Sequence, residues 1–287
     1  MLEGNNTSLY NVVSAAAYRL QYGGLAPNED GAWTMWGGPG PGSVYFTTYA
    51  LYFLASLGNS TIPGYAELVN HTLVENGAVW LAEQQEDDGY WIGRGSDYLR
   101  SKNTLTAWAL RALILSKPYA SPANQATIQN SIDKAIAYLV SSQNSDGGWG
   151  DVNENETGWR WSSIEYKRSN AYTTGLILYD LVISGNTSTA VENAKQDAVH
   201  WLTTYGNNNE TSSQFLPISR DVASHSYSYI GSFTEATAYA LMGLNATGLA
   251  DTNTSIFLGR SYLLDIYQSD GSWGYTKSSA AAIAALT

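Results

Sequence analysis

Carboxylates recur in one short phrase of this sequence, and the first question is whether they perform acid–base chemistry. The phrase reads QEDDGYW at residues 85–91, QNSDGGW at 143–149 and QSDGSW at 268–273. A catalytic acid needs neighbours that keep it protonated until it reacts. The string Glu86-Asp87-Asp88 lies instead in a polar turn with glycine, where solvent keeps carboxylates ionised. These acids are therefore predicted to be turn residues.

Other candidate carboxylates precede or open apolar stretches. Glu165 and Glu235 are weak catalytic candidates, because two carboxylates can serve a glycoside hydrolase or lyase. Loop residues expected near the same end of the helices are candidate ligand-binding residues: Tyr98, Arg100, Tyr166, Arg168, Tyr227 and Tyr229. The alternative is that all of these side chains are helix caps and solvated loop residues.

One loop resembles a calcium site in its alternation of oxygen-bearing side chains. Asp151, Asn153 and Asn155 are the weak calcium candidates, but Glu156 stands where such loops place glycine. The chain has no cysteine and only three histidines, so a cysteine-ligated zinc site and disulfides are excluded. The sequence therefore predicts no metal site beyond that weak candidate, and no cofactor.

The overall composition limits the classes of partner that the chain is expected to bind. The net charge of −11 argues against nucleic acid and anionic membrane surfaces, which both require a basic face. No apolar run reaches the roughly 18 residues of a membrane span. An unknown neutral or cationic ligand, or a protein partner, is expected.

Asparagines in N-x-S/T frames are about twice as frequent as chance, which would supply about four. They are Asn5, Asn6, Asn59, Asn70, Asn155, Asn186, Asn209, Asn245 and Asn253. N-linked glycans on an extracellular or cell-surface protein would explain the excess, with the signal and anchor beyond these residues. Polar turns that favour Asn, Ser and Thr are the alternative.

The Trp-containing phrases are spaced as a repeat. Trp33, Trp91, Trp149 and Trp273 follow one another at intervals of 58, 58 and 124 residues, and the last interval equals two periods. The repeats run over about 23–85, 86–143, 144–206, 207–268 and a truncated 269–287, in one domain over 1–287. The fourth lacks a Trp phrase, and a longer loop within 206–231 takes its place.

Each Trp phrase separates two kinds of predicted helix. Amphipathic helices precede it, at 66–85, 124–143, 188–206 and 254–268. Nearly all-apolar helices follow it, each opening with a Ser, Thr or Asn cap, at 43–58, 101–116, 169–185, 232–244 and 277–286. Stacking such pairs gives an all-α fold with inner and outer helices: an incomplete α/α toroid of about four and a half repeats.

The phrase itself is predicted to close each repeat. The glutamine at the end of the outer helix is expected to reach backbone groups left open at the next helix start, and Gly to supply the turn. The Trp is expected to pack over the junction. The residues given this structural role are Gln85, Trp91, Gln143, Trp149, Gln268 and Trp273.

These phrases resemble the QW motif of the squalene–hopene cyclase and prenyltransferase repeat superfamily. The resemblance implies an α/α barrel over nearly the whole chain. The resemblance also implies three chemistries: an Asp-x-Asp-Asp acid in the cyclases, zinc held by Asp, Cys and His in the prenyltransferases, and a Cys-Gly-Glu-Gln thioester in complement-type domains. This sequence lacks the residues that each of them requires.

A non-catalytic role is therefore predicted. The chain is expected to be a repeat domain of a cell-surface or secreted protein, binding a ligand or a protein partner in or near the mouth of the toroid. The alternative is an enzyme with a divergent active site, either terpenoid cyclase-like or a carbohydrate-active α/α barrel.

Overall fold

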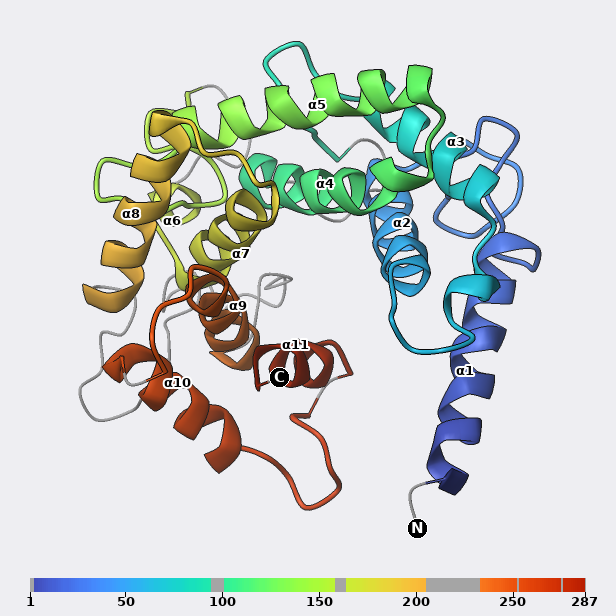
Figure 1. The fold of residues 1–287 in the computed structure, drawn as a ribbon. Helices are drawn as coiled ribbons and strands as arrows, with labels where there is room; N and C mark the ends of the chain where they lie inside the picture. Colours follow the sequence, from blue (N-terminus) through green and yellow to red (C-terminus); the bar gives the residue numbers. More distant parts are fainter. Residues whose placement is uncertain are drawn as a thin grey trace. The chain divides into compact units, whose positions relative to one another are not determined.

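We describe the protein from a computed structural model that defines residues 3–93, 101–157, 164–204, 233–251, 253–274 and 276–286. Side chains are defined in these ranges except at 3–7, 164–165, 233 and 276–277. The described chain is helical and contains no β-strand, which confirms the all-α class (Figure 1). It forms two compact units. Unit 1 is Met1–Arg100 with Trp108–Ala135, and unit 2 is Ser101–Ala107 with Ile136–Thr287. The single domain stays a prediction.

Unit 1 begins with a long helix and contains the first helix pair. Its elements are α1 (Glu3–Gln21), α2 (Val44–Gly58), the 3-10 helix η1 (Ala66–Leu68), α3 (His71–Glu83) and the 3-10 helix η2 (Lys117–Tyr119). Two further helices contribute to both units: α4 (Lys102–Ser116) gives its first turns to unit 2, and α5 (Pro122–Ser141) gives its last turn.

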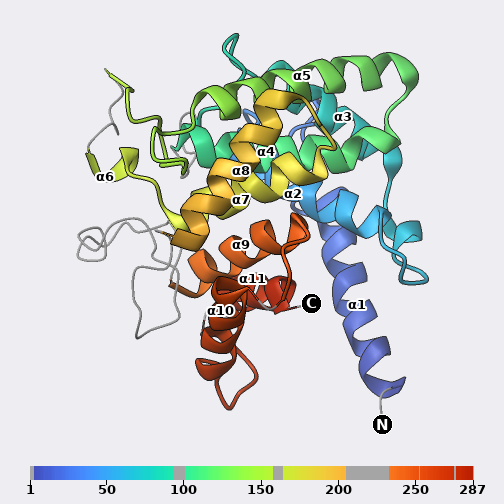
Figure 2. The ribbon, with the colours of Figure 1, turned by 60° about the vertical axis from the view of Figure 1, so that its left-hand side comes forward.

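Unit 2 shows the two helix layers that an α/α toroid requires. Its own helices are α6 (Ile164–Lys167), α7 (Ala171–Ile183), α8 (Thr189–Thr204), α9 (Phe233–Ala246), α10 (Thr254–Asp265) and α11 (Thr276–Leu286). The helices α7, α9 and α11 pack side by side as an inner layer, with α8 against α7 and α10 against α9 (Figure 2). These are the inner and outer helices that the sequence predicts, with ends shifted by a few residues.

Glycines allow the inner helices to approach closely. A Cβ atom on Gly175 of α7 would lie 2.4 Å from the Tyr239 carbonyl oxygen, and one on Gly243 of α9 would lie 2.6 Å from the Gly175 oxygen. Any larger residue would push the two backbones apart. Gly175 and Gly243 therefore mark a backbone-to-backbone contact between α7 and α9.

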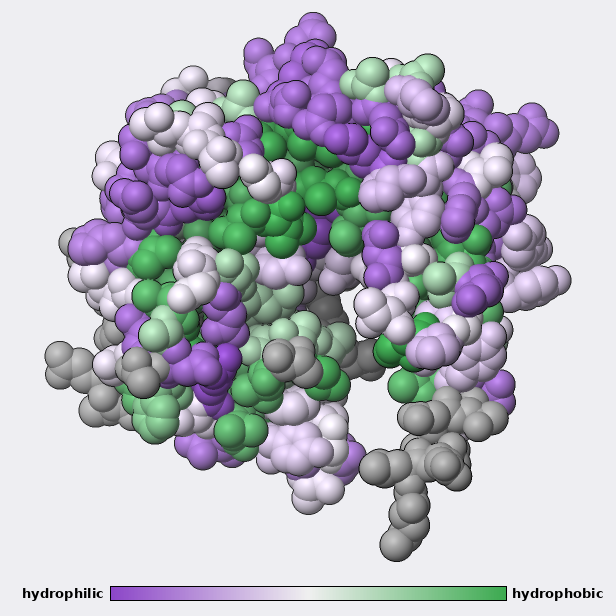
Figure 3. Space-filling model, in the orientation of Figure 1, coloured by the Kyte–Doolittle hydropathy of each residue, from purple (hydrophilic) through white to green (hydrophobic). Residues whose placement is uncertain are grey.

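The inner helices are more buried than the outer ones, as the hydrophobic pattern predicts. In α7, ten of the thirteen residues are buried, whereas α8 buries one stripe that includes Val191, Ala194 and Ala198. Hydrophilic side chains cover α5 and α8 and hydrophobic ones cover much of α4 (Figure 3). None of the described helices combines the length and apolarity that a membrane span needs.

Three inner helices carry the predicted caps. The hydroxyl of Ser43 accepts a hydrogen bond from the Phe46 amide (3.2 Å), that of Ser101 from Thr104 (3.1 Å), and the Asn170 amide oxygen from Thr173 (2.8 Å). Each cap satisfies a backbone N–H that has no partner inside the helix.

The Trp phrases are one turn repeated with the same hydrogen bonds. In each, the glycine two residues before the Trp has positive φ, between 84° and 91° at Gly31, Gly89, Gly147 and Gly271. The indole N–H then donates to a leucine carbonyl at the end of the preceding outer helix. These bonds are Trp33 to Leu20 (2.9 Å), Trp91 to Leu81 (2.8 Å), Trp149 to Leu139 (2.7 Å) and Trp273 to Leu263 (2.6 Å). The first bond shows that α1 is an outer helix, which the sequence analysis missed.

The glutamines join neighbouring repeats. Gln85 Nε2 donates to the carbonyl of Ser131 on α5, and Gln143 Nε2 to that of Ala194 on α8, both at 2.9 Å. Each Nε2 also donates to a glycine carbonyl of its own turn, Gln85 to Gly89 at 2.9 Å and Gln143 to Gly147 at 2.8 Å. The partners thus lie in the turn and in the middle of the next outer helix, and the predicted partner at a helix start is wrong. Asp146 joins the same contact, since its carboxylate accepts from the Trp201 indole at 3.0 Å.

The third copy of the phrase is one residue shorter. The backbone bond from Gln268 N to Ser272 O corresponds to those from Glu86 to Tyr90 and from Asn144 to Gly148. Gln268 therefore does not match Gln85 and Gln143. Tyr267 takes that position, and its ring lies 4.7 Å from the Trp273 ring, centroid to centroid.

Replacing Gly147 with alanine should destabilise the protein by about 1–3 kcal/mol, because an L-residue is strained at its φ of 91° and the new Cβ would lie 2.9 Å from the Asp197 carbonyl oxygen. Gly185→Ala is the matched control, with φ of 67° but no atom within 4 Å. Urea denaturation of both variants measures the difference. Equal losses would show that the contact with α8 contributes nothing.

Candidate functional site

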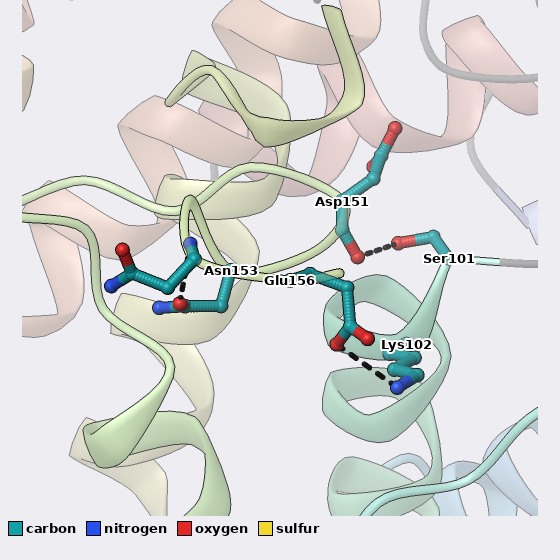
Figure 4. Close-up of polar contacts among 6 residues, drawn as sticks. Ser101, Lys102, Asp151, Asn153 and Glu156 are labelled. Atoms are coloured by element: carbon teal, nitrogen blue, oxygen red, sulfur yellow. Dashed lines mark hydrogen bonds and ion pairs between the residues drawn. The ribbon is translucent and has the colours of Figure 1, made fainter. Parts of the chain in front are cut away.

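The most unusual polar group of unit 2 is the carboxyl of Asp151, two residues after the second fully buried Trp. Its backbone is held by the first turn of α4. Ser101 Oγ donates to the Asp151 carbonyl oxygen at 2.8 Å (Figure 4). The Asn103 amide donates to the same oxygen at 3.0 Å, and Asn103 Nδ2 donates to the Gly150 carbonyl oxygen at 2.9 Å. The loop is therefore fixed against the start of this inner helix.

The Asp151 side chain lies between two inner helices. Its Oδ1 accepts from the hydroxyls of Thr104 on α4 (3.2 Å) and Thr173 on α7 (3.5 Å), while Oδ2 has no hydrogen-bond partner. The residue is 1% exposed. Burial raises the pKa of this carboxyl from its ordinary 3.8 to about 7, and hydroxyl hydrogen bonds oppose the rise only in part. Asp151 can therefore hold a proton near neutral pH, in a place almost wholly shielded from solvent.

An ion pair lies beside this carboxyl. Lys102 Nζ, on the first turn of α4, lies 3.0 Å from Glu156 Oε2, and the two side chains are 10% and 21% exposed (Figure 4). A cation at a helix N-terminus is unfavourable with respect to the helix dipole, so the Glu156 carboxylate offsets the charge. The pair fastens the loop after Asp151 to the helix.

The structure does not bring the calcium candidates together. Asp151 directs its carboxyl towards Thr104 and Thr173, whereas Asn153 lies on the other side of the loop (Figure 4). Asn153 Nδ2 donates to the Ser142 carbonyl, and its Oδ1 accepts from the Asn155 amide. Within the described ranges no three His, Cys, Asp or Glu side chains converge as a metal site would require.

The catalytic pair of the sequence analysis is not tested. The side chain of Glu165, on the short helix α6, lies outside the described residues. Glu235 is 6% exposed in the first turn of α9, and its Oε1 accepts from Ser278 Oγ of α11 at 3.0 Å. Like Asp151, Glu235 thus joins the starts of two inner helices.

Only two of the predicted ligand-binding residues are described. Tyr166 is half-buried and its carbonyl accepts from the Val152 amide, while Arg168 is exposed. Tyr98, Arg100, Tyr227 and Tyr229 lie outside the described residues, as does the loop of the fourth repeat. Asp87 and Asp88 are exposed, as expected of turn acids.

Unit 1 contains a ladder of aromatic rings that the sequence analysis missed. Along α2, Tyr45 and Tyr49 lie 4.8 Å apart, and Trp108 of α4 lies 5.2 Å from Tyr49 and 5.5 Å from Tyr52, between ring centroids. The three tyrosines are half-buried, and Trp108 is 2% exposed. We call these four residues the aromatic wall. The i, i+4, i+7 spacing of the three tyrosines on α2 is the sequence feature from which this ladder could have been predicted.

A buried cation lies behind this wall. The Arg111 guanidinium carbon is 4.9 Å from the Trp108 ring centroid and 5.8 Å from that of Tyr52, and the residue is 1% exposed. A guanidinium this close interacts favourably with the ring quadrupoles.

The raised pKa of Asp151 predicts a pH-dependent stability. Between pH about 4 and about 7 the folded state holds a proton that the unfolded state has released, so stability falls as pH rises through this window. Asp151→Asn mimics the protonated side chain and should flatten the fall, leaving the variant more stable than the parent at pH 8. Urea denaturation across this range measures it. Asp197→Asn, at an exposed carboxylate, is the control; a similar effect in both variants would contradict the assignment.

Comparison with known proteins identifies the family to which this architecture belongs. Residues 8–159 and 69–213 match the family model of the squalene-hopene cyclase C-terminal domain, and together these matches cover more than half of the chain. The chain is also 33% identical over 124 residues to a squalene–hopene cyclase from Zymomonas mobilis subsp. mobilis, a stretch that covers 43% of this chain and 17% of that relative. With the repeated Trp turns and two helix layers, these matches show that the chain belongs to the squalene–hopene cyclase C-terminal domain family.

Proposed function

We propose that this chain is a non-catalytic member of its family, which binds an uncharged apolar ligand along the aromatic wall and forms part of a cell-surface or secreted protein. The observation that carries the proposal is the aromatic wall itself, in which three half-buried tyrosines of α2 line up with Trp108 of α4. The wall offers apolar contact area to a ligand.

The aromatic wall favours an apolar ligand, because each of its four rings lies within 5.5 Å of a neighbouring ring and together they form one apolar surface. Half-buried Tyr45, Tyr49 and Tyr52 can still gain from covering by an apolar molecule.

The carboxyls of unit 2 also support binding without catalysis. The sequence has no Asp-x-Asp-Asp string. Asp151 and Glu235 are buried between the starts of inner helices, where they bond to threonine and serine hydroxyls of this chain. A catalytic acid must touch its substrate, and a side chain that is 1% exposed, like that of Asp151, does not.

Squalene is the natural probe, because the Zymomonas mobilis relative is named as a squalene–hopene cyclase. The purified chain, incubated with squalene in detergent micelles and re-isolated, should retain squalene without converting it. Tyr49→Ala with Tyr52→Ala should lower retention about tenfold, since two stacking surfaces are lost. Gas chromatography with mass spectrometry measures both bound squalene and product.

Tyr18→Ala provides the matched control, because Tyr18 is 63% exposed on α1 and is not part of the wall. It should leave retention unchanged. A cyclised product from the parent chain would refute the non-catalytic role. Equal retention by the wall variant and the control would refute the wall as the binding surface.

The surface location is supported by where the N-x-S/T asparagines lie. Among those described, Asn59 and Asn155 are exposed and none is buried. The side-chain amide of Asn155 makes fewer hydrogen bonds than that of Asn70. Asn70 Nδ2 donates to the Tyr22 hydroxyl, and its Oδ1 caps α3.

If the protein passes through a glycosylating compartment, Asn155 should be modified and Asn70 should be modified much less. Mass spectrometry of peptides from the protein isolated from its own source, with and without enzymatic deglycosylation, tests this. Unmodified Asn155 and Asn59 would contradict the glycosylated, secreted setting and leave the binding proposal to its own test.

A further inference from the structure

An aspartate directly precedes the positive-φ glycine in every Trp turn. The four pairs are Asp30-Gly31, Asp88-Gly89, Asp146-Gly147 and Asp270-Gly271, and they are all the Asp-Gly pairs in the sequence. An aspartyl carboxyl can close a succinimide ring with the following backbone nitrogen, and glycine has no Cβ that would hinder the approach. Each Trp turn therefore carries the residues for one spontaneous reaction of its own backbone.

The reaction starts when the glycine nitrogen attacks the aspartyl Cγ. A bond forms between nitrogen and Cγ, the carboxyl C–O bond breaks, and the hydroxyl leaves as water with the amide proton. Water then opens the ring at either carbonyl. Addition at Cγ restores aspartate. Addition at the other carbonyl breaks the original peptide bond and leaves the chain running through Cβ and Cγ, as isoaspartate. Water is the only co-reactant.

The backbone holds the attacking nitrogen alike in the second and third turns. The Gly89 N–H donates to the Glu86 carbonyl at 2.8 Å, and the Gly147 N–H donates to the Asn144 carbonyl at 3.0 Å. Both glycines are buried with φ of 91°. Local opening must therefore break the same backbone bond in either turn before the nitrogen can attack.

The carboxylates of these two turns are held differently, although both aspartates are exposed. The Asp146 carboxylate accepts from the Gly148 amide at 3.0 Å, from Ser169 Oγ at 2.6 Å and from the Trp201 indole at 3.0 Å. No residue in the described part of the chain donates to the Asp88 carboxylate or forms an ion pair with it. The Asp88 side chain can therefore turn its Cγ towards the nitrogen without losing a hydrogen bond.

We propose that Asp88 and Asp30 are sites of spontaneous isoaspartate formation, and that the hydrogen bonds of the Asp146 carboxylate protect the third turn. Asp30 is exposed, and its carboxylate also has no donor among the described residues. Asp270 is partly held, since it accepts from the Ser272 amide and hydroxyl at 3.0 and 2.7 Å. The reaction needs no ligand, so this proposal is independent of binding at the aromatic wall.

Isoaspartate in the second turn would disturb the contact between two repeats. It lengthens the backbone by one methylene between Glu86 and Tyr90, whose N–H and carbonyl are bonded across the turn at 2.9 Å. The Gly89 carbonyl, which accepts from Gln85 Nε2, is displaced with it. The same Nε2 donates to Ser131 on α5, so the contact between α3 and α5 is weakened. The new α-carboxylate is the group that isoaspartyl carboxyl methyltransferases modify.

Incubation of the folded chain in heavy-oxygen water tests the proposal, because each ring opening places a heavy oxygen in the product. Peptide mass spectrometry reads the label at each Asp-Gly pair. Asp88 and Asp30 should gain label at least about tenfold faster than Asp146, since cyclisation at Asp146 costs hydrogen bonds of the carboxylate. In the urea-denatured chain the three sites should react at similar rates.

An Asp88 peptide without label, or equal rates at Asp88 and Asp146 in the folded chain, would overturn the proposal. The same rate ratio in the denatured chain would also overturn it, because local sequence would then set the rates. Ser169→Ala removes one donor from Asp146 and should speed labelling there several-fold while leaving Asp88 unchanged. An unchanged rate at Asp146 would contradict the protective role of these bonds.

The effect on the fold is measured by urea denaturation before and after prolonged incubation. The parent chain should lose stability as isoaspartate accumulates, whereas Asp30→Ser with Asp88→Ser, which cannot cyclise at these sites, should keep its starting value. Glu29→Ser with Asp87→Ser is the matched control, because it removes two neighbouring exposed acids that glycine does not follow. It should age like the parent. Equal ageing of both double variants would contradict the effect on the repeat contact.

Discussion

The bond from each Trp indole to a leucine carbonyl at the end of its own outer helix sets the geometry of this fold. The last carbonyls of a helix have no partner inside it, and burying them unpaired would be costly. Trp33, Trp91, Trp149 and Trp273 each satisfy one such carbonyl across a turn with the same backbone bonds. The turn therefore fixes the direction in which the next inner helix begins.

The same turn also links one repeat to the next. Gln143 and Asp146 both reach α8, the outer helix of the following repeat, through its Ala194 carbonyl and its Trp201 indole. Stability in such an array comes from intrinsic terms within each repeat and from interfaces between neighbours. Asp146 contributes to the second of these terms, because its carboxylate accepts from the Trp201 indole of the next repeat.

At the starts of the inner helices α4 and α7, two opposing effects act on the charge of the Asp151 carboxyl. Asp151 lies at the starts of α4 and α7, where helix dipoles and threonine hydroxyls favour a carboxylate. Burial disfavours the charged form more strongly, since one oxygen has no partner, and the pKa rises to about 7. In unit 1 the buried charged group is a cation: the guanidinium of Arg111 lies 4.9 and 5.8 Å from the ring centroids of Trp108 and Tyr52, whose faces interact favourably with it.

The periodicity of apolar residues, the capping residues and the repeated Trp phrase determined the family and the order of inner and outer helices from residue 43 onwards, but not the outer helix α1. Those features arise from short-range rules that act within one helix or one turn. Contacts between residues far apart in the chain were not predictable in this way. From the sequence, Asp151 was only a weak calcium candidate, and the packing of the helices shows its carboxyl between Thr104 and Thr173. It gave the end-helix glutamine a partner at the next helix start, whereas the tertiary structure places that partner inside the next outer helix. Burial and partner choice depend on which helices meet, and a one-dimensional pattern does not specify that.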